Sequence, residues 1–358
     1  RMSADSVHRH RTVESAPGDR AFLATFVATF AGLAALLAGL VWITDPTAAF
    51  GTAVLPPVVS ADRDYKASLY RDGTARPQVV VLGSSRVKTL RPACIASLAE
   101  APAFNFGVNA GVAEDYLAIF RFLRSDPGFA VREILLGADP EAFTGEPGAG
   151  RALETSRMLG AYAPRAGTGP QASRAADLLS LESVAASFRS LRRHLLPAAE
   201  LPQEAIASDG WQTHPKWDAE IAAGEFIQPV RVSESVVSVS RRYRPGLRLS
   251  AERLELLEEL LQEARRAGVA VTAFIPPVHP DLEGNRAAES LPSLTADMEA
   301  VLRDAERRGL LRFVETSEGA GYPNDPGLYY DAVHMMPENG DRLLTWVYRG
   351  TEGAGCAV

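Results

Sequence analysis

One uncharged segment restricts what the start of this chain can fold into more than any other feature of the sequence. The residues from Ala21 to Thr44 include no charged side chain and are rich in Ala, Leu, Phe and Val. At a rise of about 1.5 Å per residue, a helix of this length crosses the roughly 30 Å hydrocarbon core of a bilayer. The buried helix of a soluble domain rarely lacks a polar stripe. The sequence therefore predicts one transmembrane helix over 21–44.

The charges on either side of this segment predict its orientation. Arg1, Arg9, Arg11 and Arg20 precede it, whereas the first charge after it is Asp45. Under the positive-inside rule, residues 1–20 stay in the cytoplasm and the bulk of the chain is exported. A cleaved signal peptide is the competing interpretation, but its apolar core is normally about 7 to 15 residues long. We therefore expect a retained single-pass anchor in a bacterial-type cell membrane, with bilayer lipid as a partner and a periplasmic or extracellular main domain.

Bulk composition limits the remaining classes. The chain has 358 residues and 46% hydrophobic content, which is enough for a sizeable core. Its net charge of -7 argues against nucleic acid as a partner. The two cysteines, Cys94 and Cys356, imply no disulfide framework, and a bridge between them is disfavoured because Cys356 lies in a tail of small residues. No ligand spacing predicts a metal, and no motif predicts a cofactor.

The exported part alternates strand-like with helix-like segments, which indicates an α/β fold around a parallel sheet. Ser250 is a plausible N-cap for the helix that follows it. The strand-like segments are Val79–Leu82, a run from Phe104, Val131–Leu136, Val269–Ile275 and Leu311–Val314. The helix-like segments are Tyr116–Leu123, Ala251–Ala267, Leu294–Arg308 and Pro337–Tyr348.

The pattern is looser from residue 144 to residue 249, where we expect an insertion or cap over the working edge of the sheet. Glycine- and proline-rich turns interrupt this region, and a basic helix-like stretch lies within it. The predicted organisation is a cytoplasmic tail (1–20), the transmembrane helix (21–44), a linker (45–77), an α/β domain (78–350) and a short tail (351–358).

Two polar motifs lie where a parallel α/β sheet places catalytic groups. Ser85 lies in the run Val-Val-Val-Leu-Gly-Ser-Ser-Arg (79–86), where a predicted buried strand ends in small residues. His334 lies just before the last predicted helix, with Asp331 three residues earlier in the same loop. Serine becomes a nucleophile when a neighbouring base accepts its proton, and histidine needs a carboxylate to hold its tautomer. The sequence therefore predicts a Ser85, His334 and Asp331 triad.

These motifs resemble the SGNH, or GDSL-like, esterase and acyltransferase superfamily, in its membrane-anchored form with a Gly-Ser-Ser-Arg first block. The resemblance covers roughly residues 79–139 and 269–348. Gly83-Ser84-Ser85-Arg86 is similar to the first block, and Asp331-Ala332-Val333-His334 to the last. The run from Asn105 to Gly111 resembles the second block, which supplies a glycine amide to the oxyanion hole. The resemblance implies a three-layer fold, Ser85 as nucleophile, and the amides of Ser85 and Gly111 as oxyanion donors, with Gly107 a poorer fit than Gly111.

The third block departs from the family pattern. Its usual Gly-x-Asn-Asp is Gly137-Ala138-Asp139-Pro140 here, so Asp139 occupies the position of the third oxyanion donor. An ionised Asp cannot donate a hydrogen bond to an oxyanion. Loss of one such donor can cost on the order of 10²–10³ in turnover. Three interpretations follow: Asp139 is protonated, another donor replaces it, or the protein is a weak or inert member.

Two further residues are candidates for substrate binding. Arg86 could contact an anionic group, although an arginine at the start of a helix commonly makes a local ion pair. His279, between two prolines after a predicted strand, could face the cleft or simply belong to the loop. Trp211, His214 and Trp217 in the insertion could form a sugar-stacking surface or pack the insertion against the domain.

The resemblance predicts an esterase or O-acyltransferase that acts on an acylated envelope glycan or lipid. A second hypothesis is a catalytically weak or inert SGNH-fold subunit of a larger membrane complex, held there by its helix. It rests on Asp139 and on small residues of the apolar segment, among them Gly32 and Gly39, which let helices approach closely. Other integral membrane proteins would then be its partners.

Overall fold

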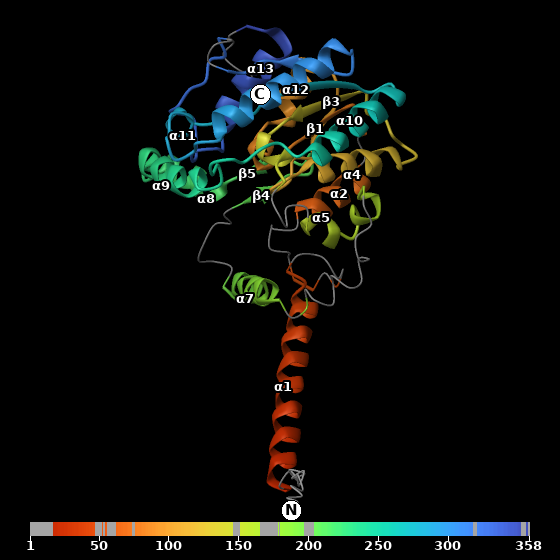
Figure 1. Cartoon of the computed structure of the whole chain (residues 1–358), viewed down its shortest axis with the longest axis vertical. Helices are drawn as coiled ribbons and strands as arrows, with labels where there is room; N and C mark the ends of the chain where they lie inside the picture. Colours follow the sequence, from red (N-terminus) through yellow and green to blue (C-terminus); the bar gives the residue numbers. More distant parts are fainter. Residues whose placement is uncertain are drawn as a thin grey trace, which may run out of the picture.

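The computed structural model describes residues 17–46, 52, 54, 55, 62–73, 76–145, 151–164, 178, 180–196, 204–317, 321–351 and 356. One long helix projects from an α/β domain that holds most of the remaining chain (Figure 1). The basic flank with Arg1, Arg9 and Arg11 lies outside the described residues, as does most of the tail predicted over 351–358.

The projecting helix is α1 (Pro17–Thr44). Its segment Ala21–Thr44 has a mean hydropathy of 2.2, and only 6% of its most apolar window is buried against other parts of the protein. Phe22, Phe26 and Phe30 are all more than half exposed. By length and composition, α1 is apolar enough to cross a membrane, as predicted.

Five parallel strands form the central sheet, in the order β2-β1-β3-β6-β7. In the interior strand β1, Val80 lies opposite Phe104 of β2 on one side and Ile134 of β3 on the other. All four residues of β1 are buried, as expected for an apolar strand covered on both faces. The strands are β1 (Val79–Leu82), β2 (Ala103–Asn105), β3 (Glu133–Gly137), β6 (Ala270–Phe274) and β7 (Arg312–Val314).

Helices cover both faces, which confirms the predicted three-layer α/β class (Figure 1). Val80 and Leu82 point into a core shared with α2, α4, α10 and α12, whereas Val79 and Val81 point into a core shared with α3 and α13. The alternation follows from the two-residue period of a strand. These helices are α2 (Asp62–Asp72), α3 (Pro92–Ala99), α4 (Ala113–Arg124), α10 (Ala251–Arg266), α12 (Leu291–Arg307) and α13 (Pro337–Arg349).

The insertion leaves and re-enters the domain at one point. Thr144 forms an antiparallel bridge with Leu249, and the Ser250 amide donates to the Phe143 carbonyl over 2.7 Å. The Ser250 hydroxyl also accepts from the Arg253 amide, which makes it the N-cap of α10 as the sequence predicts. The described elements of the insertion are α5 (Arg151–Thr155), η4 (Gly160–Tyr162), α7 (Leu181–Leu195), β4 (Ala205–Ile206), β5 (Gln212–Thr213), α8 (Pro215–Ala222) and α9 (Gln228–Ser240).

The expected linker over 45–77 holds a helix that belongs to the domain. Within α2, Ala67 and Tyr70 are buried in the core beside α4. Asp62, Arg63 and Lys66 of the same helix are also buried, and each has a charged or carbonyl partner outside α2. Its charged residues give α2 a polar sequence, so the linker prediction was wrong for residues 62–72.

A disulfide joins Cys94 of α3 to Cys356, with the two Cα atoms 5.2 Å apart. The sequence argued against this bridge, and that prediction was wrong. The small residues around Cys356 in the sequence do not prevent the bridge, because Cys356 lies beside Cys94 of α3. Cys94 is fully buried in the second core, and Cys356 packs against the same core. The bridge closes a loop of 262 residues.

We expect Cys356→Ser to lower the free energy of unfolding by about 2–5 kcal/mol, because long closed loops restrict the unfolded chain most. The measurement is urea unfolding of the oxidised protein, with the Cys94→Ala variant alongside. Both single variants and the double variant should lose a similar amount, since all three break the same bond. A double variant as stable as the parent would contradict the stabilising role of the bridge.

Candidate active site

The predicted triad residues meet at the carboxyl edge of the sheet. Strand β1 has β2 on one side and β3 on the other, so the chain order reverses between β1 and β3. In open α/β sheets, the crevice beside such a switch point is the usual place for a ligand. Ser85 follows β1 directly and begins the short helix η2 (Ser85–Val87). His334 comes from the loop before α13, far away in sequence.

The turn that presents Ser85 is fixed by close packing. Val87 lies over the ends of β1 and β3, where a Cβ on Gly137 would come within 2.3 Å of a Val87 methyl. A Cβ on Gly83 would meet the same side chain at 2.7 Å. The Ser84 hydroxyl accepts from the Arg86 amide at 3.2 Å and so caps the short helix. The glycines therefore let Val87 lock the position of Ser85.

A continuous hydrogen-bond chain links the three residues. The His334 Nε2 atom lies 2.9 Å from the Ser85 hydroxyl, and His334 Nδ1 lies 2.8 Å from Asp331 Oδ2. The other oxygen of Asp331 accepts from the backbone amides of Val333 and His334, each at 2.8 Å. The side chains of His334 and Asp331 keep 25% and 19% of their accessible surface, so the site is open to solvent.

The charge state of Asp331 suits this arrangement. Burial opposes ionisation of the carboxyl group, but the adjacent His334 and three hydrogen bonds outweigh it and lower the pKa to about 2. Asp331 is therefore a carboxylate at neutral pH. It favours the tautomer in which His334 Nδ1 carries the proton, and this leaves Nε2 as the acceptor that faces Ser85.

The insertion and the loop after β6 support the histidine loop. Ala332 and Val333 pack against Val232, Val236 and Val239 of α9 in one apolar cluster. Tyr330 donates its hydroxyl to Asp218 at 2.5 Å. The rings of His214, Trp217 and Phe226 surround Tyr330, with centroids 4.9, 5.2 and 6.3 Å away. The insertion thus packs against the loop that carries His334.

Trp211 and His279 have structural contacts. The Trp211 indole donates to the Thr89 carbonyl at 3.1 Å, so this ring attaches the insertion to the domain. His279 is buried, and its Nδ1 accepts from the Asp281 amide at 3.1 Å as the cap of the short helix α11 (Pro280–Glu283). Its own amide donates to the Ala332 carbonyl at 3.0 Å. Through these contacts, His279 supports the histidine loop.

Arg86 and Asp139 form a buried ion pair next to Ser85. Arg86 is 3% exposed and Asp139 is 1% exposed. One Asp139 oxygen contacts the Arg86 guanidinium, and the other accepts from the Ser84 hydroxyl. Arg86 also donates to the Tyr243 hydroxyl at 2.6 Å. Burial would lower the pKa of Arg86, but Asp139 and Tyr243 raise it above its ordinary value, so the guanidinium stays charged.

This arrangement changes two predictions. Arg86 was expected to be a substrate ligand, but its guanidinium is used inside the protein. Asp139 was expected in the oxyanion hole, yet both of its oxygens are engaged by Arg86 and Ser84. The Gly111 amide is also in use, since it donates to the Val108 carbonyl at 3.2 Å. In this geometry, each of the three groups already has a partner within the protein.

At the site, the backbone amides of Ser85 and Ala110 have no hydrogen-bond acceptor among the described residues. Ala110 has a φ of 46°, a left-handed conformation that is uncommon without glycine. The loop 105–111 lies against the Ser85 turn, because the Val108 amide donates to the Gly83 carbonyl at 3.0 Å. The unusual conformation of Ala110 could not be inferred from an alanine in the sequence.

The same loop rests on buried charges that the sequence did not reveal as part of the site. Lys66 of α2 donates to the carbonyls of Asn105 and Gly107 at 3.0 and 2.7 Å. Its burial lowers its pKa well below the ordinary value. Lys88 bridges the Asp62 carboxylate and the Asn109 side-chain oxygen at 3.1 and 2.7 Å. Through these contacts, helix α2 supports loop 105–111.

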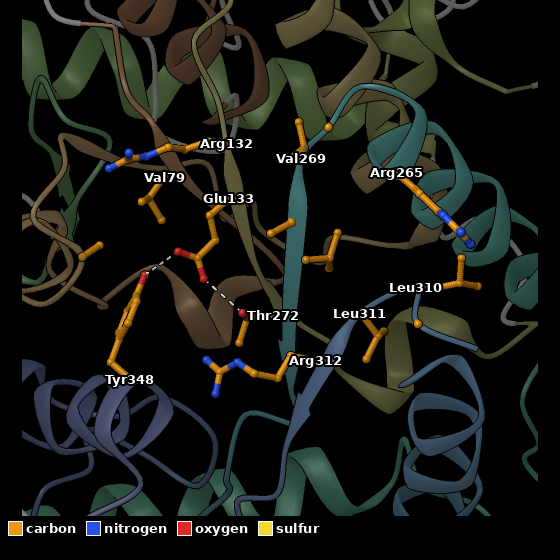
Figure 2. Close-up of a pocket in the computed structure, with 15 residues that line it drawn as sticks. Val79, Arg132, Glu133, Arg265, Val269, Thr272, Leu310, Leu311, Arg312 and Tyr348 are labelled. Carbon is orange, nitrogen blue, oxygen red and sulfur yellow. Dashed lines mark hydrogen bonds between the residues drawn. The ribbon is translucent and has the colours of Figure 1, made fainter. Parts of the chain in front are cut away.

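A cavity of about 830 Å³ lies at the opposite edge of the sheet, at the amino ends of β3, β6 and β7 (Figure 2). Glu133 lies at its centre and accepts from Thr272 and Tyr348 at 3.0 and 3.3 Å. Figure 2 shows the guanidinium groups of Arg132 and Arg265 pointing to opposite sides. This cavity contains no triad residue. Across the described residues, no cluster of His, Cys, Asp and Glu side chains is arranged to hold a metal ion.

No protein-family model and no curated protein matches the chain. Among solved structures, a proposed acylhydrolase from Bacteroides fragilis NCTC 9343 is 11% identical, with a TM-score of 0.38 over 82% of this chain and 97% of that one. A proposed platelet activating factor from Streptococcus pneumonia is 11% identical, with a TM-score of 0.37 over 81% of this chain and 90% of that one. Such low scores add nothing to the sheet topology and site geometry described above.

Proposed function

We propose that this chain is a membrane-anchored, extracytoplasmic serine esterase or O-acyltransferase of the SGNH type. One observation carries the proposal: Ser85, His334 and Asp331 form an unbroken hydrogen-bond chain at the switch point of a parallel sheet. Both distances already lie in the range that proton transfer needs. The Gly-Ser-Ser-Arg and Asp-x-x-His motifs that predicted these residues support the same assignment.

The geometry supports a two-step acyl transfer. The Ser85 oxygen attacks the carbonyl carbon of an ester, and its proton passes to His334 Nε2. The tetrahedral intermediate collapses, the bond to the leaving alcohol breaks, and that alcohol takes the proton from His334. Water or an acceptor hydroxyl then attacks the acyl-serine and gives its proton to His334. The bond between the acyl group and the Ser85 oxygen breaks, and His334 returns the proton to Ser85. The amides of Ser85 and Ala110 are the donors we assign to the oxyanion, in place of Gly111 and Asp139.

We expect a serine-directed fluorophosphonate to label the full-length protein at Ser85, because only an activated serine displaces the fluoride. Mass spectrometry of the labelled peptide identifies the site. Ser85→Ala should abolish labelling, whereas Ser293→Ala, a change at an exposed helix serine, should leave it intact. If the parent protein melts cooperatively, and is therefore folded, but takes up no label, that result would count against the proposal.

The proposed substrate is an acylated glycan or lipid of the cell envelope. Helix α1 would hold the domain close to such a substrate, and the solvent-open triad can accept an ester presented on a large molecule. The Cys94–Cys356 disulfide supports an oxidising compartment, where such bonds persist. The acyl group and the acceptor would be identified by incubating purified protein with envelope fractions and following released or transferred acyl groups.

The proposed orientation of the chain across the membrane can be tested separately. In intact spheroplasts, we expect added protease to digest the α/β domain, because the basic flank should keep residues 1–20 inside. A tag on the N-terminus should survive until the membrane is opened with detergent. If the α/β domain is protected and the tag is cleaved, the orientation is the reverse of the one proposed.

An inert subunit remains the alternative function. It would be favoured by a His334 turned away from Ser85, whereas the observed separation of 2.9 Å supports chemistry. One feature still favours association with other membrane proteins: a Cβ added to Gly32 or Gly39 would meet no atom within 4 Å, so part of the small-residue face of α1 is open. A stoichiometric complex purified in mild detergent, with an organisation that Ser85→Ala leaves unchanged and with no labelling at Ser85, would support the subunit hypothesis.

A further inference from the structure

Helix α7 (Leu181–Leu195) of the insertion lies apart from the α/β domain. Figure 1 shows it beside the end of α1 that adjoins the domain. None of its described side chains belongs to the cores of the α/β domain, and the helix packs mainly against α1. The Ser180 hydroxyl caps it by accepting from the Ser183 amide at 3.1 Å. The helix therefore has a defined start and a position set by α1.

The contact with α1 uses small residues. Ala186, Ser187 and Ser190 of α7 are 2%, 0% and 2% exposed. The Ser187 hydroxyl donates to the Ser183 carbonyl of its own helix at 2.8 Å, so it needs no partner on α1. On α1, residues 21–33 are exposed, whereas Val41 near the other end is buried. Helix α7 thus lies at the level of the last turns of α1.

The opposite face of α7 exposes large apolar side chains. Leu181, Phe188 and Leu195 are spaced by seven residues, which places them in one stripe along the helix. They are 89%, 55% and 66% exposed. Arg189 and Arg192 are exposed beside this stripe. An apolar stripe flanked by arginines is the pattern of helices that lie in a membrane interface.

The position of α7 along α1 identifies what covers this stripe. If α1 spans the bilayer, its last turns lie at the outer boundary between headgroups and acyl chains. A helix held against those turns meets the same boundary, where Leu and Phe enter the acyl region. Arginines at this depth reach lipid phosphates, which attract them most strongly when the headgroups are anionic.

We propose that α7 is an interfacial helix that lies in the outer leaflet beside α1, with Leu181, Phe188 and Leu195 in the acyl region and Arg189 at anionic headgroups. This proposal rests on the proposed anchoring by α1, but not on the activity of Ser85. Together, α1 and α7 would give the domain two attachments to the bilayer. Two attachments fix the tilt of the domain, and hence the height of Ser85 above the lipid surface.

Depth-dependent quenching tests this in the full-length chain, reconstituted into vesicles of phosphatidylcholine with phosphatidylglycerol. Phe188→Cys carries an environment-sensitive fluorophore, and the lipids carry spin labels near the headgroup end of the acyl chain. We expect a blue-shifted emission and strong quenching. Ser293→Cys, on the exposed side of α12, is the matched control and should stay unquenched. Trp42→Cys, at the end of α1, reports the anchoring separately.

The outcomes are distinct. Quenching at positions 42 and 188 supports the proposal, and Arg189→Glu should then weaken quenching at 188 in phosphatidylglycerol vesicles but not in pure phosphatidylcholine. Quenching at 42 with a water-like emission at 188 overturns the interfacial helix and leaves the anchoring intact. The absence of quenching at both positions overturns the anchoring itself, and the interfacial helix with it. Quenching at 188 that Arg189→Glu does not alter overturns the headgroup contact.

Discussion

Replacing Asp331 by Asn is expected to lower turnover by about 10⁴-fold while the domain stays folded. An amide in place of the carboxylate can hold the wrong imidazole tautomer, with the proton on the nitrogen that should accept from Ser85. It also removes the charge that stabilises the protonated imidazole. Ser85→Ala or His334→Ala should have a larger effect and lower turnover by about 10⁶-fold relative to the parent. The measurement is the hydrolysis of a generic acetyl ester by each purified variant.

Non-additivity separates this prediction from a loss of stability. Because the three residues act as one unit, adding Asp331→Asn to Ser85→Ala should cost almost nothing more. Thermal melts of each variant serve as the folding control. Hydrolysis by Asp331→Asn within tenfold of the parent would show that the observed triad is not the reacting group.

Acid should lower the stability of the folded protein by protonating Asp331. The pKa of Asp331 is lowered from 3.8 to about 2 in the folded protein. Its contribution to stability is therefore present above about pH 4 and is lost as the pH falls from 4 towards 2, with a size on the order of 2 kcal/mol. Over that interval the parent should lose more stability than Asp331→Asn does. At milder acidity Asp331 stays ionised, so a loss of activity there reports protonation elsewhere at the site.

The sequence predicted those parts of the fold in which local pattern and final environment agree. The all-apolar run of β1 becomes an interior strand of the sheet, and Ser250 caps α10 as its position suggests. The triad could be predicted for a similar reason. A small-residue turn after a buried strand and an Asp-x-x-His loop before a final helix reach the same edge of the sheet, because parallel strands all end there.

The missed features depend on partners that are distant in the sequence. In the sequence, α2 has the polar composition of a linker. In the structure it is part of the domain, because Arg63 pairs with Asp115 and Lys66 donates to carbonyls of loop 105–111. The disulfide depends on the contact of Cys356 with Cys94 of α3, 262 residues earlier in the sequence. The sequence did not reveal the turn in which the Gly111 amide donates to the Val108 carbonyl. It also gave no sign that Ala110, the preceding residue, has a left-handed conformation.

Asp139→Asn tests most directly whether the structure or the family pattern describes the oxyanion hole. The pattern predicts a gain, since an asparagine would restore the usual donor, and one donor is worth on the order of 10²–10³ in turnover. The structure predicts the reverse. Asp139 neutralises Arg86 in a buried site. The other carboxylate near Arg86 is that of Glu141, which lies 4.0 Å from the guanidinium. Removing one partner of such a pair costs about 3–5 kcal/mol, because the other charge stays buried and uncompensated.

We therefore expect Asp139→Asn to lower the melting temperature by roughly 10 °C and to give no gain in ester hydrolysis. Glu141→Gln is the matched control, because it removes a charge that is partly exposed and farther from Arg86, and it should cost less. Combining Asp139→Asn with Arg86→Met should recover part of the loss, since neither charge is then left alone. An Asp139→Asn variant that melts with the parent and hydrolyses esters faster would place residue 139 in the oxyanion hole, and would show that the Arg86 pair gives way when substrate binds.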